Sequence, residues 1–349
     1  MNHLLRLAFL GLLGAAAAVT VAVVLARALR LWLDRRRERL AAGPRRILLE
    51  FLADGGPPDQ LEELVALRGP HWRALEPAAT AMLAKVRGEA RDALVEVFER
   101  HGVGDRALRD LGRAGAVRRG RAAETLGSLR RRDAVPALCA RLADRDPDVR
   151  LAAVRALGRI GDPAAAGPLL ATLAIPEPAP VQLVAYALVQ LDAGADHALL
   201  AGLDHPDPQV RATVLDTLRL RGTTGAEARV VAVLREDPSA EVRRRAAAML
   251  GRVGGRASLD PLVAAARGDA DREVRAAAAR ALGDLGTPAA VPALRDLVGD
   301  RRYRVAHEAA AALVRLGDPG LAALRELAVD GTGAAHAHEA LAAADLALR

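Results

Sequence analysis

Apolar and polar residues follow a helical period along most of the chain. Between Asp146 and Gly161, apolar side chains fall at positions i, i+3, i+4, i+7 and i+8, namely Val149, Ala152, Ala153, Ala156 and Leu157. This spacing predicts a short helix with one buried face. No stretch shows the sustained alternation, rich in Val, Ile, Thr and aromatic residues, that is typical of a strand. The pattern therefore predicts an all-α protein.

The helical pattern recurs every 30 to 32 residues. The sequence DPDVRLAAVRALGRIGDPAAAGPLLATL from Asp146 resembles DREVRAAAARALGDLGTPAAVPALRDLV from Asp271. One leucine of each copy, called the marker leucine below, sets the phase: Leu126, Leu157, Leu188, Leu218, Leu250, Leu282 and Leu313. A second apolar position follows about twelve residues later: Leu138, Leu169, Leu200, Val230, Leu262, Leu294 and Leu324. Each copy predicts two helices, which bury their apolar faces only by stacking on neighbouring copies.

Turn residues predict where the helix that carries the marker leucine, called the second helix of each copy below, begins and ends. At Asp146-Pro147 the aspartate side chain is suited to cap free backbone N–H groups, and proline fits the first turn of a helix. Glycine recurs four residues after the marker leucine, where a helix end favours the left-handed conformation: Gly161, Gly222, Gly254, Gly286 and Gly317.

The pattern D-x-x-V-R-x-x-A-x-x-A-L-G-x-x-G, followed by D-P-x-A-x-x-x-L, resembles the HEAT repeat, most closely the short bacterial kind named after phycobilisome lyases. The resemblance covers roughly residues 115–330 and implies an α-solenoid of about seven clear units. It also implies a hydrogen-bonded ladder between aspartates and arginines of adjacent units, whose arginines are Arg119, Arg150, Arg211, Arg243 and Arg275. Val181 and Ala306 hold the arginine position in two units, which predicts interruptions there.

The unit around Tyr186 departs most from the pattern. It reads IPEPAPVQLVAYALVQL in place of D-x-x-V-R, with prolines at 176, 178 and 180. These prolines predict a kink or a widened loop between helices. The irregularity indicates either a binding groove or the decay of one repeat.

The remaining segments complete the predicted organisation. They are a short N-terminus (1–6), a transmembrane helix (7–26), a basic segment (27–46), degenerate helical repeats that cap the array (47–114), the solenoid (115–330) and a C-terminal capping helix (331–349). Capping is expected because the end units of a stack must hide their last apolar face.

Residues 7–26 are a run of 20 residues without a charge, which suffices to cross a bilayer as a helix. Most nearby arginines follow the run, whereas a secretory signal carries its charges in front. The positive-inside rule then predicts a single-pass protein of the cell membrane, with its N-terminus outside and its solenoid in the cytoplasm. A cleaved signal and a peripheral helix are the alternatives. Arginines between Arg35 and Arg39 are also suited to anionic lipid headgroups.

The net charge of +7 is confined to one end of the chain. Residues 1–46 contain nine arginines against Asp34 and Glu38, so residues 47–349 are electrically balanced. Nucleic-acid binding needs a basic face, and single-strand binders usually add stacking aromatics, which are only 2% here. We therefore expect no nucleic-acid partner.

The sequence offers no recognisable catalytic, cofactor or metal site. Cys139 is the only cysteine and reads as a small buried thiol. His336 and His338 lie near Glu339, with His307 one repeat earlier, but positions i and i+2 of a helix point about 200° apart. The two histidines could share a metal ion only if this segment were a loop.

A balanced solenoid without catalytic motifs predicts a membrane-anchored scaffold that binds proteins, above all membrane-associated ones. Its groove is expected two residues before or after the marker leucines, at Arg155, Arg159, Tyr186, Gln190, Asp216, Arg252, Arg280 and Asp284. One alternative is an accessory chaperone or enzyme similar to a bilin lyase, which the membrane anchor disfavours. The second is a nucleic-acid-binding solenoid.

Overall fold

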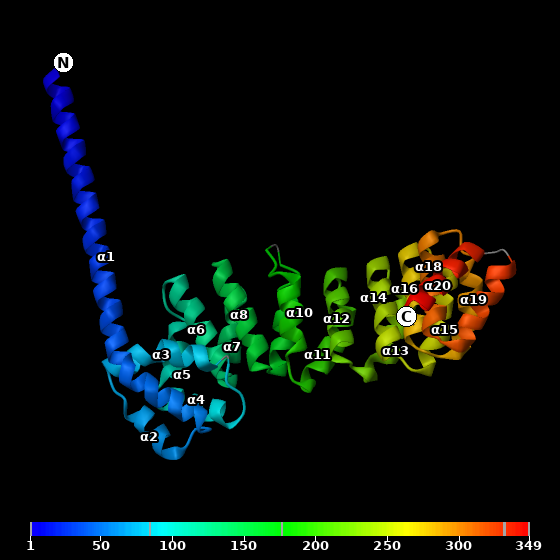
Figure 1. Cartoon of the computed structure of the whole chain (residues 1–349), viewed down its shortest axis with the longest axis horizontal. Helices are drawn as coiled ribbons and strands as arrows, with labels where there is room; N and C mark the ends of the chain where they lie inside the picture. The colour runs from blue at the N-terminus through cyan, green and yellow to red at the C-terminus, as the bar shows by residue number, and fades with distance from the viewer. Residues whose placement is uncertain (1, 84, 176, 331–332, 348–349) are drawn as a thin grey trace. The chain divides into compact units, whose positions relative to one another are not determined.

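The computed structural model describes the backbone of residues 2–83, 85–175, 177–330 and 333–347, and most of their side chains from residue 20 onward. Across these residues the chain contains α-helices and short 3-10 turns and no strand, which confirms the all-α prediction (Figure 1). The chain divides into two compact units, Met1–Ala107 and Leu108–Arg349.

The first unit contains α1 (Asn2–Ala53), α2 (Pro58–Ala66), α3 (Pro70–Leu83) and α4 (Glu89–Arg100), and α5 (Val103–Asp110) continues into the second. The second unit is a series of helix pairs. Its second helices are α6 (Ala116–Leu129), α8 (Pro147–Ile160), α10 (Val181–Val189), α12 (Pro208–Arg221), α14 (Ala240–Val253), α16 (Arg272–Asp284) and α18 (Tyr303–Arg315).

The first helices of the pairs are α7 (Val135–Arg141), α9 (Ala166–Ala171), α11 (Asp196–Ala201), α13 (Glu227–Glu236), α15 (Leu259–Gly268), α17 (Val291–Val298) and α19 (Asp318–Asp330). The last helix, α20 (Ala334–Ala347), packs on α18 and α19. Short 3-10 turns cover Arg132–Ala134, Pro163–Ala165, Ala193–Ala195, Gly202–Asp204, Thr224–Ala226, Arg256–Ser258 and Pro288–Ala290. In Figure 1 the second helices stand side by side in one layer and the first helices in another, as in a solenoid.

The ends of the second helices follow the turn residues at most positions. The Asp146 carboxylate accepts the N–H groups of Asp148 and Val149 at the start of α8. At the other end of α8, Gly161 is left-handed with φ 78°, and three further glycines at this position are also left-handed: Gly222, Gly286 and Gly317.

The prediction of a left-handed glycine is wrong at Gly254. This residue is extended, with φ −69° and ψ 153°. The next residue, Gly255, donates its N–H to the carboxylate of Glu227 on α13. The chain after α14 is therefore directed by a side chain of α13, the first helix of the same pair, and no left-handed turn is needed.

The core of the second unit forms where the repeat predicts it. Every marker leucine is fully buried. The second apolar ladder is buried as well, except at Leu200, which is half-buried because Leu199 takes the fully buried place on the short helix α11.

Neighbouring second helices approach closely at the glycine that follows the marker leucine. A Cβ atom placed on Gly158 would lie 2.8 Å from the Cα atom of Ala187 on the next helix. The same contact recurs at three further pairs, Gly127 with Ala156, Gly251 with Ala281, and Gly283 with Ala312. Val189 and Arg219 hold the glycine position on α10 and α12, so this close contact is interrupted in the irregular part of the array.

The first unit has its own core. The C-terminal part of α1 contributes Leu48 and Phe51, which are buried together with residues of α2, α3 and α4. Trp72 stacks on the ring of His101 at 3.7 Å between centroids, and the edge of Phe98 meets it from another side. The C-terminal part of α1 and the helices α2, α3 and α4 thus pack on one another.

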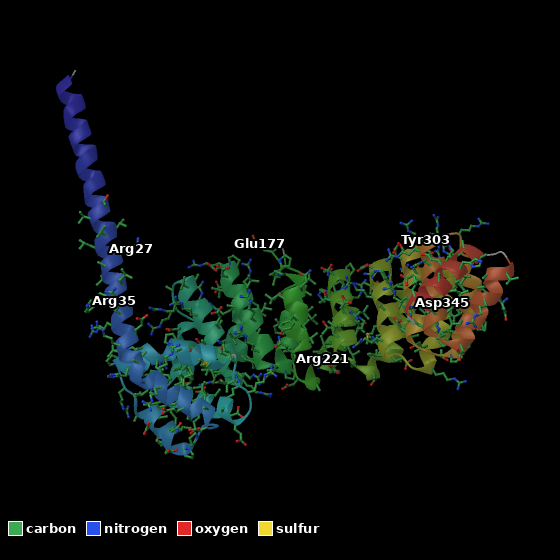
Figure 2. The ribbon with its side chains drawn as sticks, in the orientation of Figure 1. Arg27, Arg35, Glu177, Arg221, Tyr303 and Asp345 are labelled. Atoms are coloured by element: carbon green, nitrogen blue, oxygen red, sulfur yellow. The ribbon has the colours of Figure 1, made fainter. Side chains whose placement is uncertain are left out.

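The backbone of α1 is one helix from Asn2 to Ala53, including Pro44. It therefore contains the predicted span 7–26 and the basic segment without a break; Figure 2 labels Arg27 and Arg35 on it. Side chains of the predicted span lie mostly outside the described residues. Among the residues that are described, we find no helix whose length and apolar character would allow it to cross a membrane.

Candidate partner-binding surface

Arginine–aspartate pairs join consecutive units of the solenoid. Three arginines of the predicted ladder each donate two hydrogen bonds to an aspartate of the next unit, at 2.7 to 2.9 Å: Arg119 to Asp144, Arg211 to Asp237, and Arg243 to Asp269. These side chains are at most 16% exposed. Two planar groups held by two bonds fix both distance and orientation between units.

The same arginines also bind backward, to the carbonyl group six residues before them. Arg150 donates to the Asp144 carbonyl at 3.0 Å, while the carboxylate of Asp144 receives Arg119. One aspartate thus connects two consecutive arginines. The capping aspartates of the repeat pattern, such as Asp146, are different residues, since the ladder uses the acid two positions earlier.

The ladder weakens at the irregular unit and at its far end. Arg150 meets the exposed carboxylate of Glu177 at 3.1 Å, and Arg275 lies 3.9 Å from Asp300. At the ladder position after Arg150, both the arginine and its aspartate partner are missing. Val181 replaces the arginine there, and His205 replaces the aspartate. His205 accepts the Asp207 N–H at 3.1 Å, as Asp144 does for Asp146.

The ladder also sets the charge state of its acids. The hydrogen bonds from Arg119 lower the pKa of the Asp144 carboxyl below its usual value, against the effect of burial. Burial raises the pKa of Asp269, but the hydrogen bonds and charge of Arg243 outweigh it, so that this pKa is also lowered. Both acids are therefore held in the charged form.

Four of the eight predicted groove residues share one open groove on the layer of second helices. Asp216 on α12, Arg252 on α14, and Arg280 and Asp284 on α16 line it, and its volume is about 860 Å³. These residues come from the predicted positions two before or two after the marker leucines. A second depression continues the groove to α18, where Glu308 lies against Arg280.

Charges in this α12–α18 groove pair with one another across neighbouring helices. Arg245 on α14 reaches Asp216 on α12, Arg280 on α16 reaches Glu308 on α18, and Arg315 on α18 reaches Asp284 on α16. Burial raises the pKa of Glu308, but Arg280 lowers it overall. The groove wall is therefore polar and largely neutralised internally.

The other four predicted residues lie on α8 and α10. Arg155, Arg159, Tyr186 and Gln190 are exposed, and they occupy the same repeat positions as the residues of the α12–α18 groove. They do not line that groove. Within the described part of the chain, neither Arg155 nor Arg159 makes an ion pair.

The repeat geometry agrees with a known family. The family profile for HEAT repeats matches residues 111–189, 197–271 and 259–344, which is more than half of the chain. The chain belongs to the HEAT repeat family.

Several solved structures are similar to this chain. The complex of CpcE and CpcF of phycocyanin lyase from Nostoc sp. PCC7120 is 25% identical, with 64% of this chain and 92% of that chain covered and a TM-score of 0.31. The karyopherin Kap121p, bound to the extreme C-terminus of the protein phosphatase Cdc14p, is 14% identical at a TM-score of 0.51, with 79% of this chain covered. This HEAT chain spans 38% of the karyopherin's length.

At 14% identity the likeness to the karyopherin shows the fold alone. An engineered protein is also similar, at 20% identity and a TM-score of 0.38, with 89% of this chain and 94% of that chain covered. A comparison with curated proteins finds no match.

Sequence reasoning missed Arg221, which ends α12 of the HEAT array. Its guanidinium reaches back to the end of α10, where it donates to the carbonyl oxygens of Leu191 at 2.5 Å and Val189 at 3.2 Å, and to the Asp196 carboxylate at 2.8 Å. Figure 2 shows Arg221 at the edge where the second helices end, opposite Glu177 and Tyr303. The absence of a glycine four residues after Leu188 was the available signal, because the carbonyl groups at that helix end need another partner.

The histidines near the end of the HEAT array form part of an aromatic cluster. The ring of Tyr303 on α18 stacks on His307 at 5.6 Å and meets the edge of His336 from α20 at 5.1 Å. Glu339 lies 3.8 Å from His307 and 3.9 Å from His336. His338 is exposed and takes no part. Among the described residues, no group of three or more His, Cys, Asp or Glu side chains is arranged to hold a metal ion.

The single thiol lies on a first helix. Cys139 is half-buried on α7, and burial raises its pKa above the usual value. A thiol of this kind is mostly protonated near neutral pH and is a poor nucleophile.

Proposed function

We propose that this HEAT chain is a scaffold whose layer of second helices binds protein partners, and that its N-terminal helix holds it at a membrane with the solenoid on the cytoplasmic side. The observation that carries the binding role is the open groove on α12, α14 and α16, lined from equivalent positions of successive repeats by Asp216, Arg252, Arg280 and Asp284.

The stacking of the repeats makes such a groove suitable for an extended partner. Each repeat places the same two positions at the surface, so binding positions recur in a line along the array. The ladder pairs, such as Arg211 with Asp237, hold neighbouring units in a fixed relation. A surface whose positions are set in advance binds with less loss of conformational entropy.

A relative in fold supports the same kind of role. Kap121p was solved with the extreme C-terminus of Cdc14p and also with Pho4p. These partners belong to that karyopherin. For the present chain the likeness adds that this arrangement of helices can hold protein segments.

The membrane part of the proposal rests on α1. The uncharged run 7–26 and the arginine-rich segment 27–46 belong to one continuous helix. Arg36 lies 5.4 Å above the ring of Trp32, a pairing suited to the headgroup region. Arginines between Arg35 and Arg39 are then placed to meet anionic lipids on the cytoplasmic side.

Fractionation of cells tests the membrane part. The full chain is expected to stay in the membrane pellet after alkaline carbonate washing, and a variant lacking residues 2–26 is expected to be released. A fluorescent protein fused to the C-terminus should fold and fluoresce, because it would lie in the cytoplasm. Release of the full chain by carbonate, or a C-terminus that lies outside the cytoplasm, would contradict this part.

Crosslinking in cells tests the binding part. A photoreactive amino acid at position 248, on the groove side of α14 between Asp216 and Arg280, should capture a protein. Capture should fall in the double variant Arg252→Glu, Arg280→Glu and persist in Arg235→Glu, whose arginine is exposed on a first helix. Equal capture in the double variant and in the Arg235→Glu control would contradict a groove role. Visible absorbance of a tetrapyrrole in the purified chain would favour the lyase-like alternative instead.

A further inference from the structure

One helix in the layer of second helices exposes two adjacent arginines that make no ion pair with a described residue. In the α12–α18 groove most arginines make ion pairs, as Arg280 does with Glu308, and Arg252 is the exception among the described residues. On α8, Arg155 and Arg159 are exposed one helical turn apart and make no ion pair with any described residue, although Glu124 occupies the equivalent position on α6. Two adjacent arginines without partners form a natural site for a carboxylate.

Exposed apolar side chains lie on the next two second helices, α10 and α12. Tyr186 on α10 is 65% exposed and Leu220 on α12 is 54% exposed. The corresponding positions on α14 and α16 carry small or charged residues, namely Ala248, Arg280, Arg252 and Asp284. A partner that covered both side chains would gain the free energy of their burial, which makes this pair a candidate anchor site.

A shallow depression lies beside Leu220. It is lined by Val189 and Leu200 together with Leu220, and Arg221 and Asp196 border it. It occurs where the glycine contact between second helices is interrupted, because Val189 stands in the glycine position on α10. The irregular unit therefore provides an apolar recess beside Leu220, and a comparable recess between regular units is lined by Leu259 and Leu285.

We propose that Arg155, Arg159, Tyr186 and Leu220, called the α8–α12 strip, dock a short extended protein segment that combines acidic residues with one or two aliphatic or aromatic side chains. This inference rests on the proposed binding function and names its location and partner chemistry. The acidic part contacts the arginines of α8, and the apolar part covers Tyr186 and the recess at Leu220.

The spacing of the helices sets the length of this segment. Packed helices lie about 8 to 10 Å apart, so α8 and α12 are separated by roughly 20 Å across α10. An extended chain covers about 3.3 Å per residue. The segment therefore has about six residues between its acidic and its apolar contacts.

A protein segment fits the strip better than a nucleic acid does. Two arginines provide few phosphate contacts, and residues 47–349 carry no net positive charge that would attract a polyanion. Tyr186 is the single aromatic ring of the strip, whereas Leu220 and the recess beside it offer no stacking platform for a base and suit an aliphatic side chain.

Selection from a displayed library of random peptides of about 12 residues tests the strip, with the purified full chain in mild detergent as the target. We expect enriched peptides to carry Asp or Glu about six residues from Leu, Ile, Phe or Trp. A synthetic peptide of the enriched sequence should bind about tenfold more weakly to each of two double variants. One is Arg155→Glu, Arg159→Glu, and the other is Tyr186→Ser, Leu220→Ser. Lysine in place of its acidic residues should restore binding to the arginine variant.

The matched controls are Arg235→Glu on α13 and Val329→Ser on α19. Both side chains are exposed on first helices, and Val329 is 84% exposed, so these variants change charge or apolar area away from the strip. They should bind the peptide as the unchanged chain does. Circular dichroism should show equal helix content in all variants, since every substituted side chain is exposed.

Two outcomes overturn the inference: a selection that yields no peptide dependent on the strip, or enriched peptides without acidic residues. Retardation of a single-stranded oligonucleotide that is lost in Arg155→Glu, Arg159→Glu would assign the site to nucleic acid instead. The crosslinking experiment separates this inference from the proposed function. A captured partner that needs Arg252 and Arg280 but not the strip would leave the function standing and remove this site, whereas dependence on neither would remove both.

Discussion

Arg211 on α12 and Asp237, which directly follows α13, form two hydrogen bonds of 2.7 and 2.8 Å, and their side chains are only 10% and 5% exposed. The guanidinium also donates to the carbonyl groups of His205 and Pro206. One arginine thereby ties the loop before its own helix to the loop of the next helix pair. The pair thus links two consecutive units through hydrogen bonds between charged groups.

Removing the charge from this pair should loosen the array. Asp237→Asn leaves Arg211 without its carboxylate partner in a nearly buried place. We expect the free energy of unfolding to fall by about 1 to 3 kcal/mol. This loss is smaller than that for a fully enclosed pair, because the ladder borders solvent. Urea unfolding followed by circular dichroism measures this. Asp204→Asn, which removes an exposed partner of Arg229, is the control and should cost less than about 1 kcal/mol. Equal losses would contradict a special role for the ladder.

The ladder also predicts a dependence of stability on acid. The pKa values of Asp144 and Asp269 are lower in the folded chain than the value of about 4 for an unfolded aspartate. Folding therefore favours the charged form, and this contribution is complete above about pH 4 and is lost as the pH falls through the lower, folded pKa values.

Unfolding midpoints in urea, measured at a series of pH values below neutrality, test this expectation. The double variant Asp144→Asn, Asp269→Asn should start from a lower midpoint and lose less of it on acidification. If the unfolding midpoint of the double variant falls below pH 4 as steeply as that of the unchanged chain, other carboxylates cause the acid sensitivity.

Two glycine substitutions should have opposite signs. A Cβ atom on Gly251 would lie 2.7 Å from the Cα atom of Ala281, so Gly251→Ala forces α14 and α16 apart and should cost about 1 to 3 kcal/mol. Gly120, within α6, has nothing within 4 Å of the added atom. Gly120→Ala should stabilise by about 0.5 to 1 kcal/mol through helix propensity. Thermal unfolding distinguishes them, and loss of stability in both would refute the close-contact explanation.

The end of α10 should depend on a residue of the next unit. Arg221→Met removes the donor to the carbonyl groups of Val189 and Leu191 while keeping much of the side chain's apolar length. We expect faster amide hydrogen exchange across α10 and a loss of about 1 to 3 kcal/mol, because these acceptors lose their partner. Arg235→Met on α13 serves as the control. Unchanged exchange in α10 would mean that its carbonyl groups are satisfied by water.

Parts of the surface followed from repeat position alone. The rule of two residues before or after the marker leucine placed Asp216, Arg252, Arg280 and Asp284 on one groove, because every second helix presents the same face. The rule missed Leu220, which occupies the same position as Arg252. Its exposure became apparent only in the packed array, since a leucine on a helix is ordinarily expected to face the core.

The sequence by itself determined what depends on the spacing within one helix pair. The burial of Leu157 and its equivalents follows from a period of 3.6 residues, and the start of α8 follows from the capping side chain of Asp146. These features need only contacts a few residues apart along the chain.

Tertiary structure decided everything that depends on how one pair meets the next. It paired Arg119 with Asp144 in place of a capping aspartate, brought His336 to Tyr303, set Gly158 against Ala187, and neutralised the charges of the α12–α18 groove across its helices. These contacts join residues about 25 to 33 positions apart. A shift of one residue in the phase between neighbouring helices would replace each of these contacts by a contact between other residues. Local pattern carries no information on that phase, which is set by the packing of the whole stack.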